Sequence, residues 1–123
     1  MKNHSTGFLE LVSEAKKDIR TCSVQELKEK LDKLNDINLI DVREDREWDL
    51  GRLPRARHLG KGIIERDIEQ LFPDKNRELY LYCGGGYRSA LAASNLKKMG
   101  YLNVVSVDGG YTAWQNAGYG VEV

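Results

Sequence analysis

Residues 79–90 read LYLYCGGGYRSA, and this stretch decides the fold of the 123-residue chain. An apolar run leads directly into Cys83, three glycines follow, and the sequence from about Arg88 onward suits a helix. Glycines lack a Cβ atom, so the backbone of residues 84–86 can curl and direct successive N–H groups at one point. We therefore expect a buried strand, an anion-binding turn and a helix in direct succession.

Cys83 stands where this turn concentrates positive charge. A helix that begins near Arg88 adds free N–H groups and the positive end of its dipole, and the guanidinium adds a bidentate donor. Such surroundings stabilise a thiolate, so we predict that Cys83 ionises at neutral pH and acts as a nucleophile.

A structural alternative is a buried cysteine before a glycine turn that only redirects the chain. We favour the nucleophile because strand, cysteine, glycines, arginine and helix coincide in one short window. The same window fails the nucleotide-binding patterns G-x-x-x-x-G-K-[ST] and G-x-G-x-x-G, so no nucleotide site is predicted.

Further strands and helices alternate around this unit. Short apolar strands are predicted at residues 38–42, 78–82 and 103–107, with a shorter one at 57–59. Helices are predicted at about 62–71 and 89–99, the second ending at Gly100. This alternation indicates an α/β domain with a mostly parallel central sheet and helices on both faces, which places a ligand at the carboxyl ends of the strands.

Two helices are expected before the first of these strands. Residues 5–18 carry apolar side chains at helical spacing, which predicts an amphipathic helix packed on one side. The next helix opens with a capping box of Ser23 and Glu26. Its buried stripe is expected to hold Val24, Leu27, Leu31 and Leu34. We expect residues 1–20 to form an N-terminal amphipathic helical extension of the domain at 21–123.

The composition excludes several functional classes. Nineteen Lys and Arg balance nineteen Asp and Glu, so no overall field attracts the protein to nucleic acid or an anionic membrane. No apolar run approaches the roughly 20 residues that span a bilayer, and Glu10 and Glu14 interrupt any signal peptide. Cys22 and Cys83 lie far apart, which indicates a reduced, cytoplasmic protein. The cysteines and histidines lack paired spacing, so no metal site is predicted.

Four ordered motifs resemble the rhodanese-like sulfurtransferase family, specifically its single-domain members. The matches are residues 41–44 (DVRE) to the strand-end D-V-R-E, 47–56 (EWDLGRLPRA) to E-[YF]-x-x-G-H-I-P-G-A, 83–88 to the six-residue active loop, and 108–114 (DGGYTAW) to the closing G-G-[YFW]-x-x-W. The resemblance runs from about Cys22 to the C-terminus. It implies a rhodanese-like three-layer domain over residues 21–123.

The resemblance also implies a sulfurtransferase that works by double displacement. Cys83 takes the outer sulfur of thiosulfate or a similar small donor and sulfite departs. The resulting persulfide passes its sulfur to cyanide, a thiol or a protein acceptor. Substrate binding is expected from the loop residues Gly84, Gly85, Gly86, Tyr87, Arg88 and Ser89. Neither a metal nor an organic cofactor is required.

Three positions depart from the family pattern. Arg52 stands where the family usually has His, and Arg55 where it usually has Gly, which predicts a more basic rim around the site. Gly84 replaces an arginine that many sulfurtransferases carry directly after the cysteine. Arg88 is then the cation of the loop that is expected to hold the sulfonate end of the donor.

Several conspicuous residues are assigned to structure. Asp41 and Arg43 are expected to brace loops as an ion pair, and Trp48, Tyr111 and Trp114 to anchor the core. His58 is expected to be structural and Cys22 to be an inert buried thiol. Tyr87 differs because it lies in the loop, where its backbone N–H is expected to contribute to binding and its ring to point outward.

Two other functional classes stay open on the same fold. One is a cysteine phosphatase or arsenate reductase, and the other is a non-catalytic binding module. A degenerate module commonly lacks the nucleophile, whereas this chain has both Cys83 and Arg88. Phosphatases of the related fold carry Cys-x5-Arg, but here residues 84–87 leave a loop one residue shorter. The shorter ring of N–H groups favours a transferred sulfur over a phosphoryl group.

Overall fold

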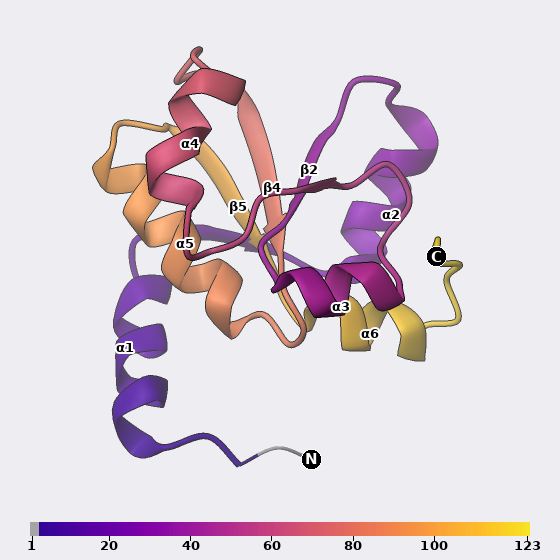
Figure 1. Ribbon diagram of the computed structural model, residues 1–123, viewed down its shortest axis with the longest axis horizontal. Coiled ribbons are helices and arrows are strands. Elements are labelled where there is room, and N and C mark those ends of the chain that lie inside the picture. Colours follow the sequence, from indigo (N-terminus) through magenta and orange to yellow (C-terminus); the bar gives the residue numbers. More distant parts are fainter. Residues whose placement is uncertain (1–2) are drawn as a thin grey trace.

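The computed structural model describes residues 3–123 and has an α/β architecture (Figure 1). The strands are β1 (Arg20–Cys22), β2 (Asn38–Asp41), β3 (Arg57–His58), β4 (Glu78–Tyr82) and β5 (Asn103–Val107). The helices are α1 (Thr6–Lys16), α2 (Val24–Lys33), α3 (Asp45–Leu50), α4 (Ile64–Leu71), α5 (Tyr87–Lys98) and α6 (Gly110–Asn116). Within the described residues, none of these helices is long and apolar enough to cross a bilayer.

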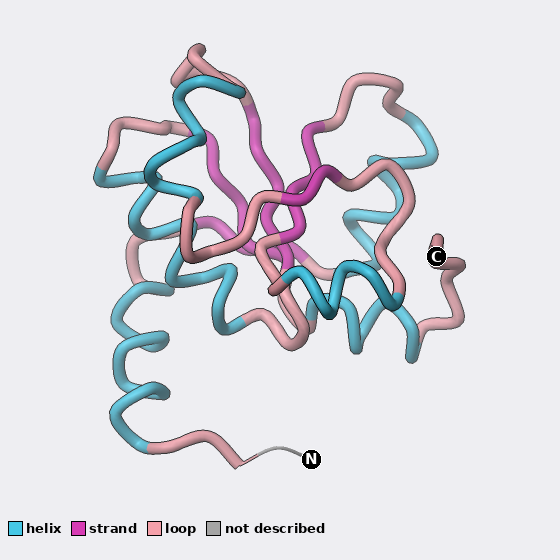
Figure 2. The backbone as a smooth tube through the Cα atoms, in the orientation of Figure 1, coloured by secondary structure: helices cyan, strands magenta, loops and turns pink. Residues whose placement is uncertain are grey.

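The five strands form one sheet in the order β1-β5-β4-β2-β3, and every neighbouring pair is parallel. The predicted fold class is therefore confirmed, with a sheet that is entirely parallel. β4 and β5 keep the bounds that their apolar runs predicted. All five strands end at the same edge, where the loop that begins at Cys83 leaves β4 (Figure 2).

Helices cover both faces of the sheet, each over its own apolar core (Figure 1). On one face, α4 and α5 bury Ile68 and Leu96 against Leu81. On the other face, α2 and α6 bury Leu27 and Trp114. Small side chains let α5 lie close to the sheet, as predicted; those that are fully buried are Ser89, Ala90, Ala92 and Ala93. Gly100 ends the helix region with a φ of 102°, a left-handed conformation that suits glycine.

The local predictions for α2 are confirmed in part. Ser23 Oγ accepts the Glu26 N–H at 3.1 Å and the Glu26 carboxylate accepts the Ser23 N–H at 3.0 Å, which completes the capping box. Leu27 and Leu31 are buried as expected. Leu34 was wrongly placed in the buried stripe, because the helix ends at Lys33 and the Leu34 backbone is extended, leaving the residue 45% exposed.

Two elements were not predicted. β1 has only three residues, two of them exposed, so it carries no apolar run. α3 follows β2 in a polar segment for which no helix is predicted above, and it contains no fully buried residue. Its signal is a capping box between Glu44 and Glu47, in which glutamate replaces the usual Ser or Thr.

α1 packs along α5, and Val12 and Ala15 are its buried residues (Figure 1). The chain then enters β1 at Arg20, which pairs with Val105 of β5. The division into an extension at 1–20 and a domain at 21–123 stays a prediction.

Candidate active site

The loop after β4 is locked in place by the start of α6. The Tyr111 N–H donates to the Cys83 carbonyl at 2.8 Å, and the Thr112 N–H donates to the Gly84 carbonyl at 3.0 Å. This close approach requires glycine: a Cβ on Gly110, whose φ is 51°, would lie 2.2 Å from the Cys83 carbonyl oxygen. The closing DGGYTAW motif therefore serves the loop by holding its backbone from behind.

Cys83 Sγ lies inside the turn and accepts two backbone N–H groups. Gly86 N is 3.1 Å and Ser89 N is 3.4 Å from the sulfur, and the Ser89 hydroxyl lies 3.5 Å away. Gly86 reaches this position with a φ of 98°, which favours glycine. Only 1% of Cys83 is exposed. The geometry suits a buried thiolate or persulfide, because both would accept these donors.

The predicted loop residues divide into two groups in space. Gly86 and Ser89 contribute N–H groups to the sulfur. Gly84 and Gly85 lie on the outer side of the loop, where Gly85 is exposed. A Cβ on Gly84 would lie 3.0 Å from the Arg88 guanidinium, so this glycine gives the arginine its space.

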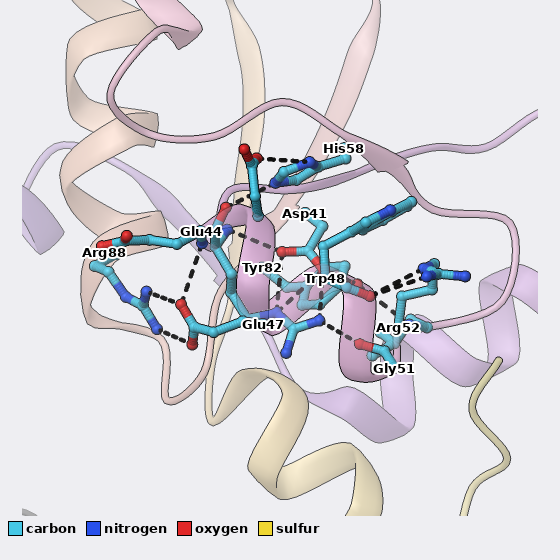
Figure 3. A network of polar contacts seen from close by, with 12 residues as sticks. Asp41, Glu44, Glu47, Trp48, Gly51, Arg52, His58, Tyr82 and Arg88 are labelled. Carbon is cyan, nitrogen blue, oxygen red and sulfur yellow. Dashed lines mark hydrogen bonds and ion pairs between the residues drawn. The ribbon is translucent and has the colours of Figure 1, made fainter. Parts of the chain in front are cut away.

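Arg88 is engaged by a residue that the sequence analysis left without a role. Its two terminal nitrogens donate to the two carboxylate oxygens of Glu47, on α3, at 2.7 and 3.0 Å (Figure 3). These hydrogen bonds lower the pKa of Glu47 to about 2. The guanidinium has further N–H donors that this pair does not use. Arg88 is therefore oriented and largely neutralised, yet still able to bind an anion.

A cleft of about 700 Å³ opens beside Arg88. Its walls are residues 42–46, from the end of β2 into α3, and residues 58–63, between β3 and α4. Lys61 and the exposed Arg46 bring positive charge to these walls, and the exposed Glu44 and Asp45 bring negative charge. Arg88 lines the cleft and also belongs to the loop that begins at Cys83, so it joins the cleft to that loop, whereas Cys83 itself does not line the cleft.

Beneath the cleft lies a second ion pair, between Asp41 and Arg43. Arg43 donates to the Asp41 carboxylate at 2.8 Å and to the Gly51 carbonyl at 2.7 Å, and the Tyr82 hydroxyl donates to Asp41 at 2.5 Å (Figure 3). Both side chains are almost completely buried. The expected bracing role for this pair is therefore confirmed.

The predicted basic rim is wrong, because both arginines face the scaffold. Arg52 donates to the Trp48 carbonyl at 3.0 Å with its guanidinium 4.5 Å from the indole centroid. Arg55 donates to the carbonyls of Leu31 and Leu34 at the end of α2. Arg55 also has a φ of 67°, which accounts for the glycine that the family usually has at this position.

The aromatic anchors are confirmed only in part. Trp114 is buried in the core, and Tyr111 is half-buried beside that core with its ring 4.2 Å from the Arg43 guanidinium. Trp48 is not a core anchor: it is half-buried on α3, with its ring stacked 4.9 Å from that of His58. The His58 Nε2 lies 2.8 Å from the Arg43 carbonyl, in agreement with a structural role.

Cys22 has a buried thiol that resists ionisation. Burial raises the pKa of Cys22 to about 11, so its thiol stays protonated at neutral pH. Both cysteines are free. Within residues 3–123, no group of three or more His, Cys, Asp or Glu side chains is placed to hold a metal ion.

The N-terminal segment contacts the loop through Tyr87. Its ring packs edge-on against His4 and Phe8, with centroid distances of 4.7 and 6.0 Å, and the Lys16 ammonium lies 5.9 Å from the same centroid. The Tyr87 side chain points outward from the turn, as expected, but His4 and the α1 residues Phe8 and Lys16 partly cover it.

Comparison with known protein families identifies the domain. The rhodanese-like domain family matches residues 23–117. A putative sulfurtransferase of Bacillus subtilis, YtwF, is 38% identical over 98 residues, which cover 80% of this chain and 92% of that protein. Another relative from the same organism, the putative sulfur carrier protein YrkF, is longer, and the chain spans 54% of its length.

Two solved structures are similar over most of the chain. A rhodanese-like domain protein from Staphylococcus aureus is 33% identical with a TM-score of 0.75, covering 85% of this chain and 98% of that one. A protein of unknown function from Rhodopseudomonas palustris, described as a possible tyrosine phosphatase, is 29% identical with a TM-score of 0.87. This second alignment covers 99% of both chains, so it includes α1.

Proposed function

The chain belongs to the rhodanese-like domain family, and on that premise we propose that it is a sulfurtransferase that carries sulfane sulfur as a persulfide on Cys83. The family and the names of its relatives support sulfur transfer in general terms. The observation that carries the proposal is the turn itself, where a buried cysteine sulfur accepts the N–H groups of Gly86 and Ser89.

The proposed reaction has two displacement steps. The Cys83 thiolate attacks the outer sulfur of thiosulfate, an S–S bond forms to Cys83, and the donor S–S bond breaks with its electron pair leaving on sulfite. A nucleophilic acceptor, cyanide or a thiolate, then attacks the terminal sulfur and releases the Cys83 thiolate. The backbone donors of Gly86 and Ser89 stabilise negative charge on sulfur in each step.

Arg88 is the proposed anchor for the donor. A guanidinium holds a sulfonate through charge-assisted hydrogen bonds, and Arg88 borders both the cleft and the loop. Gly84, Gly85 and Tyr87 complete the proposed binding loop, although none donates to the sulfur here. The cleft has room for a small donor or acceptor, or for a thiol presented by another protein. The free cysteines agree with the reducing, cytoplasmic setting that we propose.

A phosphatase is the second candidate, because the R. palustris structure that aligns over 99% of the chain is described as a possible tyrosine phosphatase. One feature of the site disfavours it. The loop has one residue fewer between Cys83 and Arg88 than Cys-x5-Arg, so its N–H groups form a smaller ring around the sulfur. Misplacement by even about 1 Å can cost roughly 100-fold in rate.

A paired turnover assay tests the proposal. Wild-type protein is incubated with thiosulfate and cyanide, and in parallel with an aryl phosphate. We expect thiocyanate to form and phosphate release to stay at background. Cys83→Ser should abolish thiocyanate formation, whereas Cys22→Ala, which removes the other buried thiol, should retain it. Phosphate release that depends on Cys83, without sulfur transfer from any donor tried, would establish the phosphatase instead.

A further inference from the structure

Ser106 is a buried polar residue in a strand whose other buried residues are all valines. It lies on β5, in the run NVVSV, and is fully buried. Side chains two residues apart share a face of a strand, so Ser106 shares its face with Val104, which belongs to the core beneath α5. A buried hydroxyl on such a face costs free energy unless it makes a hydrogen bond.

The partner of Ser106 is the active loop. Its Oγ lies 2.8 Å from Ser89 Oγ, which in turn lies 3.5 Å from Cys83 Sγ. Throughout residues 3–123 the Ser106 hydroxyl has no other hydrogen-bond partner. The three side chains therefore form a short buried chain that begins at the sulfur and ends at Ser106.

Counting hydrogens shows which state of Cys83 this chain suits. The chain has two links, Sγ to Ser89 Oγ and Ser89 Oγ to Ser106 Oγ. With a thiol, three hydrogens compete for two links, and one buried donor lacks an acceptor. With a thiolate, two hydrogens fill two links, both directed toward the sulfur. An unmade buried hydrogen bond is costly, so the chain favours the thiolate.

We propose that Ser106 is a positioning residue, which holds the Ser89 hydroxyl with its hydrogen directed at Cys83 and thereby stabilises the thiolate. The inference rests on the proposed function, since it assigns Ser106 to the same nucleophile. Ser106 touches neither the sulfur nor any substrate. It acts through Ser89, from a strand that the sheet brings beside the loop.

Other charges also face the loop, and they stay in place when Ser106 is changed. The titratable and charged side chains that surround it are Lys16 on α1, Glu47 on α3, Tyr87 and Arg88 on α5, and Asp108 after β5. Arg88 and Glu47 form one ion pair, and Lys16 and Asp108 lie 3.5 Å apart as another. A Ser106 variant therefore isolates the hydroxyl chain from these charges.

The test is a pH titration of the ultraviolet absorbance of the Cys83 thiolate, with the matching Cys83→Ser protein as blank. At any pH below the titration midpoint, we expect Ser106→Ala to lower the ionised fraction of Cys83 about three- to tenfold. This corresponds to a rise of the midpoint by about 0.5–1 pH unit. Ser106→Val also removes the hydroxyl and should raise the midpoint by the same amount. Because valine suits a strand, this variant serves as the test if Ser106→Ala folds poorly. Ser106→Thr keeps the hydroxyl and should restore the wild-type midpoint.

Val104→Ala is the matched control, because it trims the same face of β5 without removing a hydroxyl. Its midpoint should equal that of the wild type. The proposal is overturned if Ser106→Ala and Ser106→Val titrate like the wild type, or if Val104→Ala moves the midpoint equally. Since the titration needs no sulfur donor, this failure is distinct from a failure of the proposed sulfur transfer.

Discussion

Two carboxylate–guanidinium pairs lie at the same edge of the sheet, and they differ in what surrounds them (Figure 3). The Asp41–Arg43 pair is at most 4% exposed and also bonds the Tyr82 hydroxyl and the Gly51 carbonyl. The Glu47–Arg88 pair is about 30% exposed, with side-chain values of 28% and 31%.

The difference indicates that similar chemistry serves two purposes here. A buried pair whose members are bound on every side cannot exchange partners without leaving a charge uncompensated. A partly exposed pair at the edge of a cleft can exchange partners, because water or an anion can replace some of its hydrogen bonds. We therefore interpret Asp41–Arg43 as framework and Glu47–Arg88 as part of the binding site.

The largest expected effect is a loss of stability when the Asp41–Arg43 pair is broken. Asp41→Asn leaves the buried Arg43 guanidinium without its counter-charge and should lower the free energy of unfolding by about 3–5 kcal/mol. Glu47→Gln, the matched change in the exposed pair, should cost at most about 1 kcal/mol. Urea denaturation followed by circular dichroism measures both. Equal losses in the two variants would remove the distinction between the pairs.

The next effect concerns Arg88 as the donor anchor. Arg88→Ala removes charge-assisted hydrogen bonds to the sulfonate and should raise the apparent KM for thiosulfate by about tenfold to a hundredfold. Steady-state kinetics with thiosulfate as the varied substrate give this value. A thiosulfate dependence unchanged by Arg88→Ala would contradict the assigned role.

A smaller and opposite effect is expected from Glu47→Gln. The variant keeps a hydrogen-bonding side chain but leaves Arg88 with its full positive charge, so the apparent KM for thiosulfate should fall about three- to tenfold. The same kinetic assay applies. A higher KM would mean that the carboxylate is needed to orient Arg88 more than it weakens anion binding.

The smallest effect is a pH dependence of stability. Arg88 lowers the pKa of Glu47 from 4.5 to about 2, so the carboxyl ionises more readily in the folded chain than in the unfolded one. The stabilisation by this pair is then complete above about pH 4.5 and disappears as the pH falls through about 2. The difference in unfolding free energy between wild type and Glu47→Gln should narrow over that range. If this difference in unfolding free energy stayed constant down to pH 2, the Glu47–Arg88 pair would not be the source of the stabilisation.

Local sequence chemistry was enough to predict the loop and the strands that flank it. Residues 83–88 combine glycine conformations, a nucleophile and a helix start within one short segment, and the apolar runs of β4 and β5 are buried on both faces. The sheet order brings these strands together, but side-chain contacts between separate elements leave no signal in either segment of sequence.

The two contacts that the sequence did not predict join residues far apart in the chain. Glu47 on α3 bonds Arg88, which is 41 positions further along the chain. Ser106 on β5 bonds Ser89 at the start of α5. The prediction for Arg55 was wrong because residue 55 has a left-handed backbone conformation, which explains why the family usually has glycine there; the arginine charge does not serve the site. Trp48 was misjudged because α3 lies on the surface, where its ring stacks on His58.

The central claim is that Cys83 accepts a sulfur atom within its turn, and mass spectrometry of the intact protein after mixing with thiosulfate tests it most directly. We predict the addition of one sulfur atom, located by digestion to the peptide that contains Cys83, and its loss when cyanide is added. Cys83→Ser should keep its original mass. A wild-type protein that gains no sulfur from thiosulfate or any other sulfane donor, or that carries the sulfur on Cys22, would contradict the account.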